Sequence, residues 1–242
     1  MRSVWPDKPL NPEEHLWRYM KAARFESLLS NTRLFFASAN QFADRFEGAV
    51  AIVPPQYPVD PRYADVGGAE HAFRELKRLT KINCWHMSDF ESDLMWRLYA
   101  EESKGVAICS TPDRLRQACR PFRLAPSYGH EDLWGGQVRY VNLLDVRLNA
   151  GMLERFFVKH LAFAPEREFR LAISVRMAEE FAVAVPERGI EVEVDLNTLI
   201  ERVVLGPALS DEERSRITGL VGAAGLAGKL VTSGMLGMPR YT

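Results

Sequence analysis

A strand, a short helix and a second strand follow one another within residues 16–38, and this succession restricts the fold more than any other feature of the sequence. The three segments are LWRYM (16–20), KAARFESLLSNT (21–32) and RLFFAS (33–38). The outer two are short and apolar with several aromatic residues, which is typical of strands. The middle one places Phe25, Leu28 and Leu29 at helical spacing. So short a succession predicts a domain in which helices and strands are mixed.

The remaining segments continue this mixture. Strand patterns occupy residues 82–87, 104–110, 137–143, 166–175, 190–195, 199–207 and 229–233, and helical patterns occupy 69–81, 91–103, 111–120, 150–163 and 210–225. Residues 53–68 and 124–137 have the composition of loops, with proline, glycine and polar residues. Because strands and helices are mixed irregularly, we predict an α+β fold, a single domain at residues 15–242 with a central mixed β-sheet flanked by helices. Residues 1–14, rich in proline and charge, are expected to form an irregular N-terminal lead-in.

Several expected helices carry start signals. Thr111, followed by a proline, suits the N-cap position of a helix. Ser210 and Glu213 have the spacing of a capping box. Ser88 and Glu91 share that spacing directly before an apolar helical run, so helix capping accounts for Glu91 without any chemistry.

Charge and composition exclude several classes of protein. The chain has 31 basic and 32 acidic residues, a formal net charge of -1, which gives no electrostatic footprint for nucleic acid but leaves room for a local basic groove. No apolar run approaches the roughly 18 residues of a membrane span, and the N-terminus lacks a signal-peptide core. The three cysteines form no C-x-x-C pair, which favours a reducing compartment. We therefore expect a cytoplasmic protein with no membrane partner.

The metal-ligating residues form no familiar motif. The five histidines include no H-E-x-x-H arrangement, and no cysteine–histidine pair has zinc spacing. Cys84 and His86 lie on the same face of an expected strand, but two ligands do not complete a site. The glycine-rich segment 222–230 lacks the phosphate-loop spacing, because Ala223 stands where that motif needs glycine before Lys229. We predict no metal site and no tightly bound cofactor.

The segment PEREFR, residues 165–170, has the most suggestive local pattern. Glu166 and Glu168 begin an expected strand, and strand alternation would place both carboxylates on one face. Arg170 would share that face, and Lys159 could pair with the carboxylates. Two adjacent carboxylates can split their pKa values, or one can stabilise a cationic transition state. The alternative is a salt-bridged strand edge without catalytic function.

The segment from Asn83 to Ile108 combines polar and aromatic side chains. Core packing explains most of this segment, which leaves His86 and Trp96 as candidates for the wall of a pocket. Arg18, between two aromatic residues in an expected strand, needs an acceptor or a phosphate group. The segment FADRFEG, residues 42–48, suits a turn.

Four segments together resemble the bacterial family called domain of unknown function 2971. They are residues 16–48, 84–108, 159–173 and 190–207, and the resemblance extends in order over about residues 15–235. Its most specific elements are Cys-Trp-His, Glu-Ser-x-x-Met-Trp-x-x-Tyr and Glu-x-Glu-x-Arg. The chain departs from the family at Ala43 and Arg45, where Asn and Pro are usual, and at His160, where Arg is usual. The resemblance implies that certain residues are shared for chemistry or for folding: Arg18, Asp44, Glu47, His86, Glu91, Trp96, Lys159, Glu168 and Arg170.

The order of elements is also similar to that of the ADP-ribosyltransferase superfamily. There an early strand supplies an Arg or His to the dinucleotide, aromatic residues hold the nicotinamide, and a late strand begins with a catalytic Glu. This similarity implies an ADP-ribosyltransferase-like fold and an NAD-consuming transferase or glycohydrolase, with NAD as substrate. Glu168 and Glu166 would be catalytic. The nucleotide would be bound by Arg18, Tyr19, Phe46, His86, Trp96, Lys159 and Arg170.

Two other functions remain open at this point. One is a non-catalytic nucleotide or small-ligand sensor with a pocket formed by Phe46, Trp85, Trp96 and Tyr99. The other is a metal-assisted nuclease using Asp44, Glu47, Glu168 and Arg170, which the near-neutral charge argues against. The sequence does not determine the oligomeric state.

Overall fold

The computed structural model describes residues 1–52 and 66–241, so most of the predicted loop at 53–68 lies outside the described residues. Within this range the chain forms two compact units, each assembled from three stretches of sequence. Unit 1 contains Met1–Leu10, Phe35–Cys84 and Pro121–Glu191. Unit 2 contains Asn11–Leu34, Trp85–Arg120 and Val192–Thr242.

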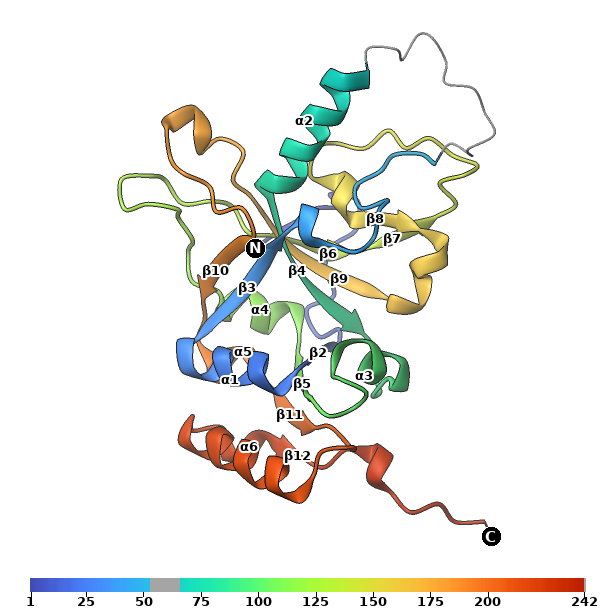
Figure 1. Ribbon diagram of the computed structural model, residues 1–242, viewed down its shortest axis with the longest axis vertical. Helices are drawn as coiled ribbons and strands as arrows, with labels where there is room; N and C mark the ends of the chain where they lie inside the picture. The colour runs from blue at the N-terminus through green and yellow to red at the C-terminus, as the bar shows by residue number, and fades with distance from the viewer. Residues whose placement is uncertain (53–65, 242) are drawn as a thin grey trace. The chain divides into compact units, whose positions relative to one another are not determined.

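Unit 1 is built on strands that pair in both directions. Its elements are β1 (Arg2–Ser3), the 3-10 turn η1 (Ala39–Gln41), α2 (Val66–Leu79), β6 (Trp134–Gln137), β7 (Arg139–Val141), η3 (Glu154–Phe157), β8 (Val158–His160), η4 (Leu161–Glu166), β9 (Glu168–Ser174) and η5 (Glu179–Phe181). It also contains parts of β3 (Arg33–Ser38), β4 (Thr80–Met87) and β10 (Gly189–Glu193). Strand β6 is parallel to β1 and antiparallel to β9, while β7 and β8 form a separate parallel pair. Figure 1 shows α2 leading directly into β4.

The core of unit 1 gathers aromatic and aliphatic side chains from distant parts of the sequence. Its buried members are Val4, Trp5, Ala39, Ile82, Phe156, Phe157, Val158 and Ala172. Burial of this apolar surface stabilises the unit by about 25 cal/mol for each Å² removed from water. The lead-in at residues 1–14 is largely irregular, yet β1 pairs with β6 and the Trp5 indole donates to the Gln137 carbonyl at 2.8 Å. Residues 1–10 of the lead-in are therefore bound into unit 1, and residues 11–14 belong to unit 2.

Unit 2 contains the strand–helix–strand succession with which the sequence begins. Its elements are β2 (Leu16–Met20), α1 (Ala22–Asn31), α3 (Asp93–Tyr99), β5 (Val106–Ser110), α4 (Pro112–Ala118), α5 (Leu196–Leu199), β11 (Arg202–Leu205), α6 (Asp211–Ala223), η6 (Ala227–Lys229), β12 (Leu230–Val231) and η7 (Gly234–Leu236). Strand β5 lies between β2 and β11 and is antiparallel to both, whereas β11 and β12 are parallel. Helix α1 packs against α6.

These pairings confirm the predicted α+β fold with a mixed sheet and helices, because each unit has parallel and antiparallel strand pairs. The ADP-ribosyltransferase-like arrangement stays a prediction. The start signals of two helices are also confirmed. The Thr111 hydroxyl accepts from the Arg114 amide, and Ser210 and Glu213 form the complete capping box.

The predicted helix at residues 150–163 is wrong. That segment contains the turn η3, the strand β8 and the turn η4. Phe156, Phe157 and Val158 are consecutive and all buried. An α-helix turns about 100° at each residue, so three consecutive buried positions would need core on most sides of the helix. Val158 instead begins the strand β8, which is extended and pairs with β7.

The end of the predicted loop at residues 124–137 is also wrong, because Trp134–Gln137 form β6. Two consecutive glycines suggested a turn, but they serve close packing. A Cβ atom on Gly135 would lie 2.7 Å from the Met1 sulfur, and one on Gly136 would lie 2.4 Å from Val4. The glycines therefore allow the N-terminal segment to lie directly against β6.

Helix α3 begins later than the sequence suggests. Its N-cap is Ser92, whose hydroxyl accepts from the Met95 amide, so the capping box predicted for Ser88 and Glu91 is wrong. The Glu91 carboxylate instead accepts hydrogen bonds from the indole of Trp96 at 3.1 Å, the hydroxyl of Ser233 at 2.7 Å and the backbone of Gly234 at 2.7 Å. Glu91 thus links the start of α3 to the C-terminal part of unit 2.

Candidate functional site

The candidate site is a chain of alternating charges in unit 1, which we call the Lys159 cluster. Its members are Lys159 in β8, Glu166 at the end of η4, Glu168 and Arg170 in β9, and Glu47 in the turn after η1. All except Glu166 are buried. The cluster joins segments that lie more than a hundred residues apart in the sequence.

The lysine holds both carboxylates of the Glu-x-Glu motif. Lys159 Nζ lies 2.6 Å from Glu166 Oε2 and 2.8 Å from Glu168 Oε1. The other oxygen of Glu168 accepts from Arg170 Nε at 2.5 Å. The predicted pairing of Lys159 and Arg170 with these carboxylates is therefore confirmed.

The carboxylates meet through a geometry that the sequence did not reveal. Strand β9 begins at Glu168, so Glu166 is not part of the strand. Arg167 between them has φ of 42°, in the left-handed region that a residue with a side chain rarely adopts. The turn at Arg167 directs Glu166 to the same lysine as Glu168. Glu168 and Arg170 do share a face by strand alternation, as expected.

Glu47 completes the buried end of the cluster. Arg170 donates from Nη1 to Glu47 Oε1 at 2.6 Å and from Nη2 to Glu47 Oε2 at 3.0 Å. This two-pronged geometry is the strongest form of arginine–carboxylate pair. The turn that holds Glu47 is fixed by Asp44, whose carboxylate accepts from the Phe46 amide at 2.8 Å, and by Gly48 at φ of 74°.

The surrounding groups fix the charged side chains in place. The Arg170 Nη1 atom also donates to the Phe156 carbonyl at 2.5 Å, and its guanidinium lies 5.5 Å from the centre of the Phe42 ring. The Lys159 ammonium lies 4.5 Å from the centre of the Phe163 ring. The Tyr140 hydroxyl accepts from the Glu168 amide at 2.8 Å, and burial raises the pKa of this tyrosine. No sequence signal pointed to Tyr140, because a tyrosine in a short strand usually serves packing.

The environment drives the ionisation of the two glutamates in opposite directions. Burial and the hydrogen bond with Glu168 raise the pKa of Glu166, Lys159 opposes the rise, and the net pKa is about 7. Burial alone would raise the pKa of Glu168 as well. Arg170, the hydrogen bond with Glu166 and Lys159 outweigh it and hold that pKa well below its usual range. At neutral pH Glu168 is ionised, whereas Glu166 changes its protonation state near neutral pH.

The two cations keep their charge despite burial. Burial lowers the pKa of Lys159, but Glu168 more than offsets this, and the net pKa is raised. The same balance, with Glu168 and Glu47 as the anions, raises the pKa of Arg170. With Glu166 protonated the cluster has two positive and two negative charges, and with Glu166 ionised it has one negative charge in excess. Glu166 is therefore the carboxylate whose charge is not compensated within the cluster.

Other predicted nucleotide-binding residues lie in unit 2. Tyr19 and Trp96 pack edge to face, with ring centres 4.9 Å apart, and both are buried in the core of that unit. The edge of His86 contacts the Tyr19 ring at a centre distance of 6.4 Å. The Arg18 guanidinium lies 5.9 Å from the centre of the Trp85 ring. Tyr19 and Trp96 act as core residues here, and the Tyr19 hydroxyl accepts from the Ser92 amide at 2.9 Å.

The structure thus divides the predicted site between the units. It brings Glu166, Glu168, Lys159 and Arg170 into one cluster in unit 1, and it groups Tyr19, His86 and Trp96 in unit 2. Phe46, in unit 1, is partly buried, with the Arg45 guanidinium 5.0 Å from its ring centre. Glu47 belongs to the cluster through Arg170, and the sequence grouped these two residues only in the nuclease alternative.

Comparisons with protein families, with curated proteins and with solved structures find no match to this chain. Among the described residues, no group of three or more His, Cys, Asp and Glu side chains is arranged to hold a metal ion. None of the helices within residues 1–52 and 66–241 is long and apolar enough to cross a membrane. The membership of the family named above stays a prediction.

Proposed function

We propose that the chain is an enzyme that cleaves a glycosidic bond, with NAD as the first substrate to test and the Lys159 cluster as its catalytic centre. The observation that carries the proposal is that Glu166 and Glu168 share Lys159 while Glu168 also accepts from Arg170, an asymmetry that moves the pKa values of the two carboxyl groups in opposite directions. Two neighbouring carboxyl groups whose environments push their pKa values apart are a recurrent arrangement in acid–base catalysis. Enzymes that cleave glycosidic bonds commonly use such a pair.

Each glutamate has a separate role in this proposal. Cleavage of the bond between nicotinamide and ribose sends the bonding electron pair to nicotinamide, which leaves as a neutral molecule. Positive charge develops on the ribose, and a water molecule or an acceptor hydroxyl attacks it. Ionised Glu166 takes the proton that this nucleophile loses, a task for which a pKa of about 7 is well matched. Glu168 supplies a fixed negative charge that does not change during the reaction.

The charge balance of the cluster favours Glu166 over Glu168 as the proton acceptor. Both oxygens of Glu168 accept from cations, through Lys159 and Arg170. A carboxylate held in this way has little basicity left for a substrate. Glu166 contacts Lys159, which it shares with Glu168, and its side chain is the more exposed of the two. We therefore assign the role of proton acceptor to Glu166, although the sequence favoured Glu168 as the main catalytic residue.

The choice of NAD rests on the order of residues along the chain and on the resemblance described above. A late Glu-x-Glu motif follows an early strand that contains Arg18. The choice of NAD is an analogy with the order of residues in the ADP-ribosyltransferase superfamily.

The test is nicotinamide release from NAD by the purified full chain, with and without cell extract as a source of acceptors. Wild-type protein should release nicotinamide, and Glu166→Gln should reduce the rate at least about a hundredfold, the usual effect of a general base. Glu180→Gln is the matched control, because Glu180 is an exposed glutamate of unit 1 outside the cluster. It should leave the rate unchanged.

Two outcomes would overturn the proposal. One is no release of nicotinamide by the wild-type protein under either condition. The other is a Glu166→Gln variant that is folded and turns NAD over at the wild-type rate. If NAD raises the unfolding temperature without being consumed, the chain is a nucleotide-binding protein instead, because a ligand of the folded state stabilises that state.

A further inference from the structure

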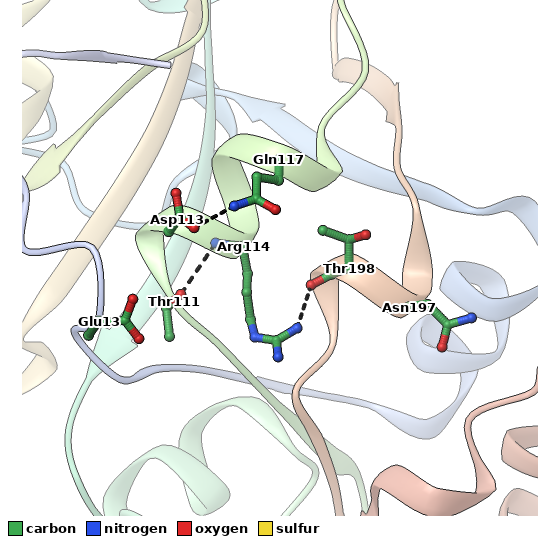
Figure 2. A pocket seen from close by; sticks show the side chains of 7 residues that line it. All are labelled: Glu13, Thr111, Asp113, Arg114, Gln117, Asn197 and Thr198. Carbon is green, nitrogen blue, oxygen red and sulfur yellow. Dashed lines mark hydrogen bonds between the residues drawn. The ribbon is translucent and has the colours of Figure 1, made fainter.

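A cavity of about 500 Å³ lies within unit 2, between the start of α4, the helix α5 and the segment that precedes β2 (Figure 2). All the lining residues are of polar type: Glu13, Thr111, Asp113, Arg114, Gln117, Asn197 and Thr198. Sites for small molecules usually measure about 300–1,000 Å³ and are mostly apolar. This cavity has the size but not the apolar lining, which indicates a small ligand rich in charged or hydrogen-bonding groups.

The walls of the cavity are held together by hydrogen bonds. Arg114 Nη1 donates to the Thr198 carbonyl at 2.9 Å and so connects α4 to α5, as Figure 2 shows. The Asp195 carboxylate accepts from the Thr198 amide at 2.7 Å and begins α5. The Asp113 amide donates to the Pro12 carbonyl at 3.2 Å, which fixes the segment containing Glu13 beside α4. The cavity is therefore formed before any ligand arrives, which lowers the cost of binding.

Two of the charged groups that line the cavity keep bonding capacity. Within the described part of the chain, only Nη1 of the Arg114 guanidinium has a hydrogen-bond acceptor. The Glu13 carboxylate accepts no hydrogen bond from the described residues, although its amide donates to Asn11. Asp113 differs, because its oxygens already accept from Arg116 and Gln117. The cavity thus offers one cation and one anion for a ligand.

The positions of these two groups specify the chemical class of the ligand. Figure 2 shows Glu13 and Arg114 on either side of Thr111. A simple anion would be attracted by Arg114 but repelled by Glu13. A simple cation would be attracted by Glu13 but repelled by Arg114. A ligand with both a carboxylate and an ammonium group satisfies both residues. Gln117 and Asn197, which also line the cavity, supply amide groups for a polar side chain of the ligand.

We propose that this cavity binds a free amino acid, with the ligand carboxylate on Arg114 and the ligand ammonium group on Glu13. The proposal concerns a separate site in unit 2 and does not depend on the activity proposed for the Lys159 cluster. The chain would then bind a small zwitterionic ligand in addition to the substrate proposed above.

The test is isothermal titration calorimetry of the full chain with each of the standard L-amino acids. At least one should bind saturably with a dissociation constant of about 1 mM or tighter. Its N-acetyl derivative lacks the ammonium group and its amide derivative lacks the carboxylate. Each should bind at least about tenfold more weakly, because each leaves one charged residue of the cavity without a partner.

Two variants locate the binding groups. Glu13→Gln should weaken binding of the free amino acid at least about tenfold but leave binding of the N-acetyl derivative unchanged. Glu13 is exposed and its carboxylate has no described partner, so this variant is expected to fold normally. Arg114→Gln should weaken binding of the free amino acid and leave the amide derivative unchanged. The matched controls are Glu14→Gln and Arg97→Gln, residues of unit 2 that do not line the cavity, and both should bind as the wild type does.

The proposal is overturned if no amino acid binds at concentrations up to about 10 mM. It is also overturned if the blocked derivatives bind as tightly as the free amino acid. Wild-type affinity in folded Glu13→Gln would equally refute it.

Discussion

Replacement of Glu168 by glutamine tests whether the Lys159 cluster holds unit 1 together. The carboxylate of Glu168 accepts from Lys159 and Arg170, and its side chain is 9% exposed. Glutamine keeps the shape but removes the charge between two buried cations. Breaking a buried ion pair by removing one partner costs about 3–5 kcal/mol, because the remaining charge is left without compensation.

Glu166 should recover part of this loss. Without the hydrogen bond and charge of Glu168, its pKa should fall from about 7, since Lys159 then remains as its charged partner. Ionised Glu166 would return one negative charge to Lys159, although Arg170 would still lack half of its anionic partners. We therefore expect a net loss of about 2–4 kcal/mol at pH 7.

The assay is equilibrium unfolding in urea, with the free energy extrapolated linearly to water. Glu26→Gln is the control, because Glu26 forms an exposed pair with Arg216 and such pairs contribute about 0–1 kcal/mol. If Glu168→Gln lowers the free energy of unfolding as little as the control does, Lys159 and Arg170 do not need the charge of Glu168. The expected fall in the pKa of Glu166 would then also lose its basis.

Three further outcomes follow from the structure. Because the folded state raises the pKa of Glu166 from 4.5 to about 7, its stabilising contribution is complete below pH 4.5 and lost as the pH rises through 7; urea unfolding between pH 5 and 8 should show this loss in the wild type and not in Glu166→Gln. Ser210→Ala, which removes the capping box of α6, should cost about 1 kcal/mol in thermal or urea unfolding, while Ser215→Ala on the exposed face of that helix should cost less. Gly48→Ala should cost at least about 1–3 kcal/mol in the same assay, because φ is 74° and a Cβ atom would lie 2.7 Å from the Phe156 ring; an unchanged midpoint would contradict this.

The elements that the sequence predicted well are those in which local pattern and tertiary role agree. Strand β2 and helix α1 follow their apolar spacing closely, and the capping box at Ser210 is present as expected. Helix α4 begins at the residue after Thr111. In these cases the chemistry of the signal is local, so neighbouring residues in the sequence are enough to specify it.

The failures have a common physical cause in contacts between distant segments. The two glycines of β6 resembled a turn because the N-terminal segment that needs their missing side chains is more than 130 residues away. The segment at 150–163 has helix-like composition, but burial of Phe156 and Phe157 together with the pairing of Val158 overrides it. No local pattern reports such a contact.

The candidate site shows the same division. The chemistry of Glu166, Glu168, Lys159 and Arg170 could be proposed from sequence because they lie within twelve residues of one another. The ion pair of Arg170 with Glu47 has no local signal, because 123 residues separate them, and the two were grouped only in the nuclease alternative. The left-handed turn at Arg167 was equally hidden, because arginine gives no signal for that conformation.

The hydrogen bonds of Glu91 also bear on how the protein is made. A ribosome releases the chain from the N-terminus at about 5–20 residues per second. Glu91 therefore emerges well before Ser233 and Gly234, which follow it by 142 and 143 residues. During that interval its carboxylate must remain hydrated or find temporary partners. The hydrogen bonds from Ser233 and Gly234 can form only after both residues have been synthesised. A chain that stalls before them would leave this carboxylate with Trp96 as its partner and would expose an unfinished surface to the proteases and chaperones of the cell.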